Sequence, residues 1–262
     1  MENYRCENTH NNPLHMKIIP PSDLVPMDIF VDREPVTIDL VYANAHHPRN
    51  IFGEALYHDT ARLWAHKDIA AITLLAARIL NHKTGYRFSL KDCLRTSDAQ
   101  IAMGETQIVK NNPDWLEEPN RMVSPPGSGA HPRGMAIDVC VLDSNDREID
   151  MGTPFDDMDP KSYRSCDMLP EGVLRNRQSL ENAFTDSAKA LNFDFLPLPS
   201  EWWDFRFQPN RYEQYQPLSD QDLPPQMQMT RRIENGIPDF ENTHFRSLAD
   251  SILSLVDKQH KN

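Results

Sequence analysis

Apolar and polar positions along the chain follow the two-residue period of a strand in several segments. Residues 36–42 alternate between the two kinds of side chain, as a half-buried strand does, and residues 135–142 form an apolar run rich in β-branched side chains, typical of a buried strand. The shorter segments 88–94 and 193–207 are predicted to complete a sheet. The run at 135–142 contains one acid, Asp138, and its burial needs an explanation.

Other segments follow the helical period. Apolar residues recur every three or four positions over residues 60–82 and 174–191, which predicts two amphipathic helices. A shorter helix is predicted from about residue 97 to 109. Residues 243–258 carry one apolar face and predict a last helix near the end of the chain.

These elements predict a single α+β domain. We expect an antiparallel sheet that carries a site on one side and is backed by the helices at 60–82 and 174–191. Prolines recur before residue 36 and predict an extended N-terminal leader over residues 1–35. The domain is expected to span 36–207. A C-terminal extension, 208–262, starts polar and proline-rich and ends in the amphipathic helix.

The composition restricts the class of protein. The chain has 262 residues, of which 39% are hydrophobic and 25% charged, so it can bury a core. A net charge of -12 repels phosphate backbones and anionic lipids, which makes nucleic acid and membrane surfaces poor partners. The longest nearly apolar stretch, residues 69–80, is too short to cross a bilayer, and the N-terminus has no signal-peptide pattern. We therefore expect a cytoplasmic protein.

A glycine-rich turn followed by a strand holds the strongest chemical signal. It places His131 seven positions before Asp138, and both are ligand types that zinc accepts. Asp138 lies among apolar residues, where an unpaired carboxylate would cost several kcal/mol, roughly, so a cation nearby is the simplest compensation. A partner arginine is the alternative explanation.

A second motif places two carboxylates beside two tryptophans. Glu201 and Asp204 flank Trp202 and Trp203 in a strand-like segment. Burial against tryptophan raises the pKa of a glutamate, which suits Glu201 for general acid and base catalysis of hydrolysis. The alternative is a tryptophan-rich core strand with an exposed acid.

Together these motifs resemble the VanX-type D-alanyl-D-alanine dipeptidases, a family of zinc peptidases. The family pattern HxxGxAxD is met in full by His131, Gly134, Ala136 and Asp138. The segment 151–159 and most of the family's ExWH motif, with Glu201 and Trp203, follow in the same order. The resemblance covers about residues 39 to 207 and implies a dipeptidase that binds one zinc ion per chain.

The resemblance also implies roles for individual residues. Glu201 corresponds to the catalytic acid and base, and Arg95 to the arginine that stabilises the oxyanion, although the family's neighbouring Gly, Tyr and Pro are missing. Tyr42 and Asp156 correspond to residues that hold the free amino end of the dipeptide. The family's serine for the substrate carboxylate is Gly129 here, and Ser128 is the possible substitute.

The largest departure concerns the third zinc ligand. The family's histidine is Asp204 in this chain, which gives a His131, Asp138 and Asp204 site. Zinc and two carboxylates sum to a charge of zero, where the usual set leaves +1. We expect from this a less acidified water, better competition by harder metals such as Mn2+, and an alkaline pH profile.

The sequence therefore predicts zinc-dependent hydrolysis of D-alanyl-D-alanine, a small-molecule substrate, for cell-wall metabolism, dipeptide salvage or glycopeptide resistance. One alternative is a related metallopeptidase that cleaves another dipeptide or a peptidoglycan peptide. The other is a non-catalytic binding module in which Asp204 no longer binds metal. The oligomeric state stays open.

Overall fold

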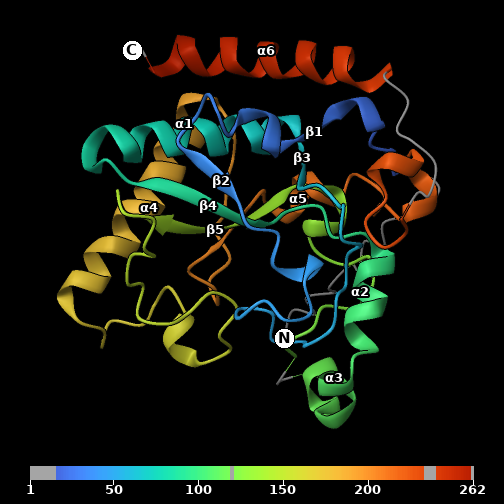
Figure 1. The fold of residues 1–262 in the computed structure, drawn as a ribbon. Helices are drawn as coiled ribbons and strands as arrows, with labels where there is room; N and C mark the ends of the chain where they lie inside the picture. The colour runs from blue at the N-terminus through green and yellow to red at the C-terminus, as the bar shows by residue number, and fades with distance from the viewer. Residues whose placement is uncertain (1–15, 119–120, 233–239, 261–262) are drawn as a thin grey trace, which may run out of the picture.

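The computed structural model describes residues 16–118, 121–232 and 240–260 and shows an α+β fold, as predicted (Figure 1). The first 15 residues of the expected leader lie outside these ranges. The strands are β1 (Leu24–Pro26), β2 (Val36–Ile38), β3 (Trp64–His66), β4 (Arg87–Asp92), β5 (Ala136–Leu142) and β6 (Asp204–Arg206). The helices are α1 (Lys67–Thr84), α2 (Ser97–Gly104), α3 (Gln107–Asn111), α4 (Glu171–Ala190), α5 (Pro209–Tyr212) and α6 (Phe240–His260).

The main sheet has the strand order β2-β4-β5-β6. Strands β4, β5 and β6 are antiparallel to their neighbours, but β2 runs parallel to β4, so the sheet is mixed and not wholly antiparallel. The parallel pair is possible because the long connection between β2 and β4 contains α1 and crosses over the sheet. Strands β1 and β3 form a separate antiparallel pair.

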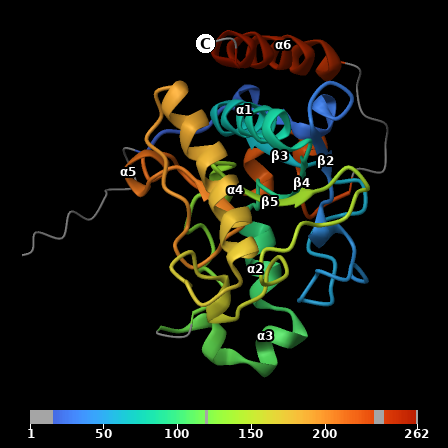
Figure 2. The ribbon, with the colours of Figure 1, turned by 90° about the vertical axis from the view of Figure 1, so that its left-hand side faces the viewer.

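Helices cover one face of the main sheet, and α1 lies between this sheet and α6 in both views (Figures 1 and 2). Phe184 of α4 stacks on Phe88 of β4 and on Phe205 of β6, with ring centroids 5.4 Å and 3.9 Å away. Ser187 of α4 donates a hydrogen bond to the carbonyl of Ile72 in α1 at 2.7 Å. The helices at 60–82 and 174–191 were therefore predicted on the correct face, although the first begins at Lys67 because Trp64–His66 pair with β1.

The other face of the sheet carries the polar residues, and a β-bulge in β4 sets their positions. Leu90 pairs with Val139, but the next pair is Asp92 with Asp138, so Lys91 is an extra residue in the ladder. Because side chains alternate along a strand, this insertion moves Asp92 onto the same face as Asp138. A regular β4 would have placed Asp92 among the helices.

Both ends of the described chain contribute to the core. Leu24, Val25 and Phe30 are buried, so the second half of the expected leader, residues 16–35, is packed and includes β1. The predicted C-terminal helix is α6, and it packs on α1 with Phe245 against Trp64 at a centroid distance of 5.1 Å. Among the described residues, none of the helices combines the length and the apolar character needed to cross a membrane.

Candidate metal and active site

Three aspartates lie side by side across three neighbouring strands. Asp92 of β4 pairs with Asp138 of β5, and Asp138 pairs with Asp204 of β6. All three are at most 2% exposed. Like charges directly opposite one another destabilise a sheet, so this row requires cations around it.

His131 supplies a ring nitrogen to the same place. The loop before β5 turns back at Gly134, whose φ of 58° favours glycine and where a Cβ atom would lie 3.2 Å from the His66 nitrogen. The Nδ1 atom of His131 lies 2.8 Å from the carbonyl oxygen of Cys93, and because a carbonyl only accepts, Nδ1 carries the hydrogen. The other ring nitrogen, Nε2, then faces Asp138 Oδ1, at 3.6 Å, and Asp204 Oδ2, at 3.1 Å.

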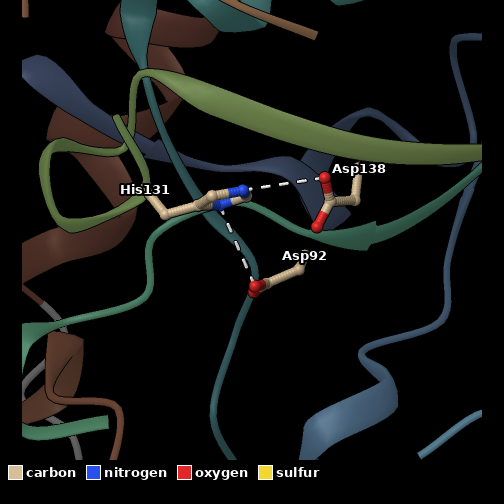
Figure 3. A group of neighbouring side chains, drawn as sticks. All are labelled: Asp92, His131 and Asp138. Carbon is tan, nitrogen blue, oxygen red and sulfur yellow. Dashed lines mark ion pairs between the residues drawn. The ribbon is translucent and has the colours of Figure 1, made fainter. Parts of the chain in front are cut away.

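This geometry fits a divalent cation. In Figure 3 the ring of His131 faces both Asp92 and Asp138. Ligand atoms of these three residues lie within 4.8 Å of one another, as do those of Asp138, Glu201 and Asp204. Within the described ranges the buried Oδ1 of Asp138 has no hydrogen-bond partner. Burial, and then the charge of Asp204, raise the pKa of Asp138 well above its ordinary value. A cation among these atoms would satisfy the unpartnered oxygen and the imidazole lone pair together.

Asp204 has a second partner, Arg206, two residues further along β6 on the same face. Arg206 Nε donates to Asp204 Oδ1 at 2.6 Å, and its NH2 donates to Oδ2. Burial pushes the pKa of Asp204 upward, but the charge and hydrogen bonds of Arg206 outweigh it, so this pKa lies well below its ordinary value. Asp204 is therefore an ionised carboxylate that is already neutralised in part.

Asp92 holds Arg95 in place. Nε and NH2 of Arg95 donate to Asp92 Oδ2 at 2.8 and 2.7 Å, and Tyr57 donates its hydroxyl to Oδ1 at 2.8 Å. The guanidinium also lies 3.6 Å from Asp138 Oδ2 and over the ring of Tyr42, 5.3 Å from its centroid. Arg95 is thus fixed beside the row of aspartates.

Tyr42, which lies under the Arg95 guanidinium, forms a hydrogen-bonded pair with Asp156. The Tyr42 hydroxyl donates to Asp156 Oδ2 at 2.8 Å, and both side chains are buried. Burial raises the pKa of Asp156 to about 7, even though the Tyr42 hydrogen bond and Arg95 act in the opposite direction. Asp156 adopts a backbone conformation with φ of 62°, a region that aspartate enters more readily than most residues.

Glu201 is half-buried and lines the same cavity as Asp138, Asp156 and Arg206. Burial, and next the charge of Asp204, raise the pKa of Glu201 to about 7, while Arg206 lowers it. A carboxyl with a pKa close to neutral can both accept and donate a proton during one reaction.

A cavity of about 230 Å³ joins these residues. Its wall includes all the predicted site residues except Asp204, which lies fully buried behind His131 and Arg206. Ser128 also lines the cavity, but its hydroxyl donates to the carbonyl of Pro125 at 2.8 Å. The structure therefore brings together the residues that the sequence motifs singled out across the range from Tyr42 to Asp204.

Sequence reasoning assigned no role to two of the residues at this site. Asp92 is fully buried and touches Arg95, and its signal in the sequence was an acid at the end of a predicted strand, three positions before an arginine. Arg206 follows Asp204 at the two-residue spacing that puts opposite charges on one face of a strand. That spacing was visible in the sequence.

A histidine and buried carboxylates that can hold a cation, with a glutamate of near-neutral pKa in the same polar cavity, define the class of metal-dependent hydrolases. The comparisons narrow this class. Residues 23–221 match the model of the D-ala-D-ala dipeptidase family. The chain is also 33% identical to the D-alanyl-D-alanine dipeptidase of Escherichia coli K12 over 178 residues, which are 68% of this chain and 80% of that protein. The chain belongs to the D-ala-D-ala dipeptidase family and is a hydrolytic metallo-dipeptidase.

Proposed function

We propose that this enzyme hydrolyses the D-alanyl-D-alanine dipeptide with one zinc ion. The observation that carries the proposal is the unpartnered, buried Oδ1 of Asp138 beside Nε2 of His131, in a cavity that also contains Glu201. The family match and the Escherichia coli relative support the substrate.

We propose His131, Asp138 and Asp204 as the zinc ligands. Arg206 alters the charge sum expected from the sequence, because zinc, two carboxylates and one guanidinium give +2 - 2 + 1 = +1. This is the charge of the usual set with two histidines and one aspartate. Arg206 therefore weakens the reasons to expect an alkaline pH profile and a preference for Mn2+, and zinc is the metal we propose.

The remaining residues act on the substrate. When bound, the metal supplies a Lewis acid that polarises the scissile carbonyl and activates water. Glu201 accepts a proton from the attacking water and passes it to the leaving amine. Arg95, fixed by Asp92, donates hydrogen bonds to the oxyanion that develops on the carbonyl oxygen.

Asp156 and Tyr42 hold the free amino end of the dipeptide. An ammonium group pairs well with a carboxylate, and Asp156 is the carboxylate at that end of the cavity. This requirement for a free amine restricts the enzyme to short peptides. A substrate other than D-alanyl-D-alanine, such as another dipeptide, stays the alternative within the same mechanism.

The family assignment argues against the non-catalytic binding module considered from the sequence. The Asp204–Arg206 pair concerns the ligand set instead: both oxygens of Asp204 accept hydrogen bonds from Arg206, which can compensate this carboxylate without a metal. Metal analysis of Asp204 variants tests whether Asp204 is a ligand. A cytoplasmic location and the boundaries of the 36–207 domain stay predictions.

The test measures the zinc content of purified protein by elemental analysis, together with release of D-alanine from D-alanyl-D-alanine. We expect about one zinc per chain and turnover, with both lost in Asp138→Asn and the zinc content reduced in Asp204→Ala. Asp186→Asn, an exposed change on α4, is the matched control and should retain both. Protein that holds no metal after zinc is supplied would refute the proposed zinc site.

A further inference from the structure

One cation in the cavity wall has no task in the mechanism above. Arg206 uses Nε and NH2 to hold Asp204, but within the described part of the chain its NH1 makes no hydrogen bond or ion pair. The side chain is 16% exposed and lines the cavity. Its free N–H donors therefore face the space that the substrate would enter.

The chain beside this guanidinium leaves room for a ligand. A Cβ atom at Gly129 would lie 3.8 Å from Arg206 NH1. Because glycine has no side chain, the space next to NH1 stays open at this position. The carbonyl of Gly129 points elsewhere, because it accepts a hydrogen bond from Arg133 at 2.7 Å. The wall at this point presents N–H donors of NH1 from which no acceptor of the described residues takes a hydrogen bond.

Ser128 is a weaker candidate than Arg206 for binding an anion at this end of the cavity. Its hydroxyl hydrogen is used on the carbonyl of Pro125, so it cannot donate to a ligand without breaking that bond. The other arginines in the wall are also engaged. Arg95 is held by Asp92 beside the oxyanion position, and Arg121 pairs with Glu118 at 3.0 Å.

We propose that Arg206 binds the terminal carboxylate of the dipeptide substrate. A dipeptide carries an ammonium at one end and a carboxylate at the other, and Asp156 and Arg206 place opposite charges on the wall of one cavity. Asp204 orients the guanidinium by its two hydrogen bonds and leaves NH1 free to donate to the carboxylate. This inference rests on the proposed dipeptide substrate.

The experiment compares two ligands that differ only in this carboxylate, D-alanyl-D-alanine and D-alanyl-D-alaninamide. Binding is measured by calorimetry on the zinc-supplied full chain with Glu201→Gln, which removes turnover. We expect the dipeptide to bind ~10- to 100-fold more tightly than the amide, the range that a hydrogen bond to a charged group supplies. With Arg206→Gln added, the two ligands should bind equally.

Removing Arg206 alone leaves Asp204 buried without its main partner, so a second variant guards against misfolding. Asp204→Asn combined with Arg206→Gln removes the guanidinium and the unpaired carboxylate together. Because it also changes a proposed zinc ligand, zinc is supplied in excess and the ratio of the two affinities is compared; this variant should also bind the two ligands equally. Arg164→Gln is the matched control, because Arg164 donates to the Asp204 carbonyl at 2.8 Å and does not line the cavity. It should keep the preference for the dipeptide.

The outcomes separate the two proposals. A preference for the dipeptide that survives the loss of Arg206, or equal binding of both ligands by the parent, overturns this inference and leaves the proposed function standing. A parent that binds neither ligand refutes the proposed function and this inference with it.

Discussion

The Asp204–Arg206 pair provides a direct measure of how strongly this site depends on an internal cation. Asp204 is fully buried, and Arg206 contacts both of its oxygens, with Nε at 2.6 Å from Oδ1. Arg206→Gln leaves a buried carboxylate whose Oδ2 lies 3.1 Å from His131 Nε2. Breaking a buried ion pair by removing one partner costs about 3 to 5 kcal/mol, and because the glutamine amide can still donate a hydrogen bond to Asp204 we expect the lower value.

The assay is urea unfolding at neutral pH in the presence of a chelator, so that metal binding does not contribute. For a protein of this size, with an m value of about 3 kcal/mol/M, a loss of about 3 kcal/mol lowers the midpoint by roughly 1 M urea. The double variant Asp204→Asn with Arg206→Gln contains two neutral amides that can hydrogen-bond, and it should lose no more than about 1 kcal/mol.

The double-mutant cycle supplies the control. We expect the double variant to be more stable than Arg206→Gln alone, with a coupling energy of about 2 kcal/mol or more. If the costs of the two single changes simply add, or if Arg206→Gln costs less than about 1 kcal/mol, then Arg206 is not the cation that compensates Asp204. The charge sum of +1 for the zinc site, which counts the Arg206 guanidinium, would then also be wrong.

Three further predictions concern other parts of the structure. The pKa of Asp156 is raised to about 7, so its carboxyl is neutral below that pH and the KM for D-alanyl-D-alanine should rise as the pH falls through 7; Asp156→Asn should raise KM and remove this pH dependence. Asp92→Asn should lower kcat by ~10- to 100-fold with an unchanged zinc content, because Asp92 positions Arg95; loss of zinc would instead make it a ligand. Phe245→Ala should cost about 3 kcal/mol in urea unfolding and leave kcat/KM unchanged, because α6 packs on α1 away from the cavity; a lower kcat/KM would contradict this.

Local patterns predicted the elements of this fold well where the period was clear. The strand at 135–142 and the helices at 174–191 and 243–258 are observed as β5, α4 and α6 with small shifts at their ends. The shorter strand at 36–42 is reduced to Val36–Ile38, and its parallel pairing with β4 was not predicted. Strand direction depends on how the chain crosses over the sheet, and no local pattern contains this.

For the site, the residue types and their order could be read from the chain without its fold. A histidine, a glycine turn, an acid in an apolar strand, and a glutamate beside two tryptophans point to a cation and an acid–base group, because burial of such charges needs compensation. Their motifs also carry the family resemblance. These inferences need only the neighbours of each residue along the chain.

Which charges meet depends on how the strands pair in the folded protein. The bulge at Lys91 turns Asp92 toward Asp138, and the β5–β6 register brings Asp204 opposite Asp138, with Arg206 on the same face. Each step is a matter of register, and a slip of one residue would send these side chains to the opposite face of the sheet. The compensation of three adjacent aspartates is a long-range property of pairing between strands that are far apart in the sequence.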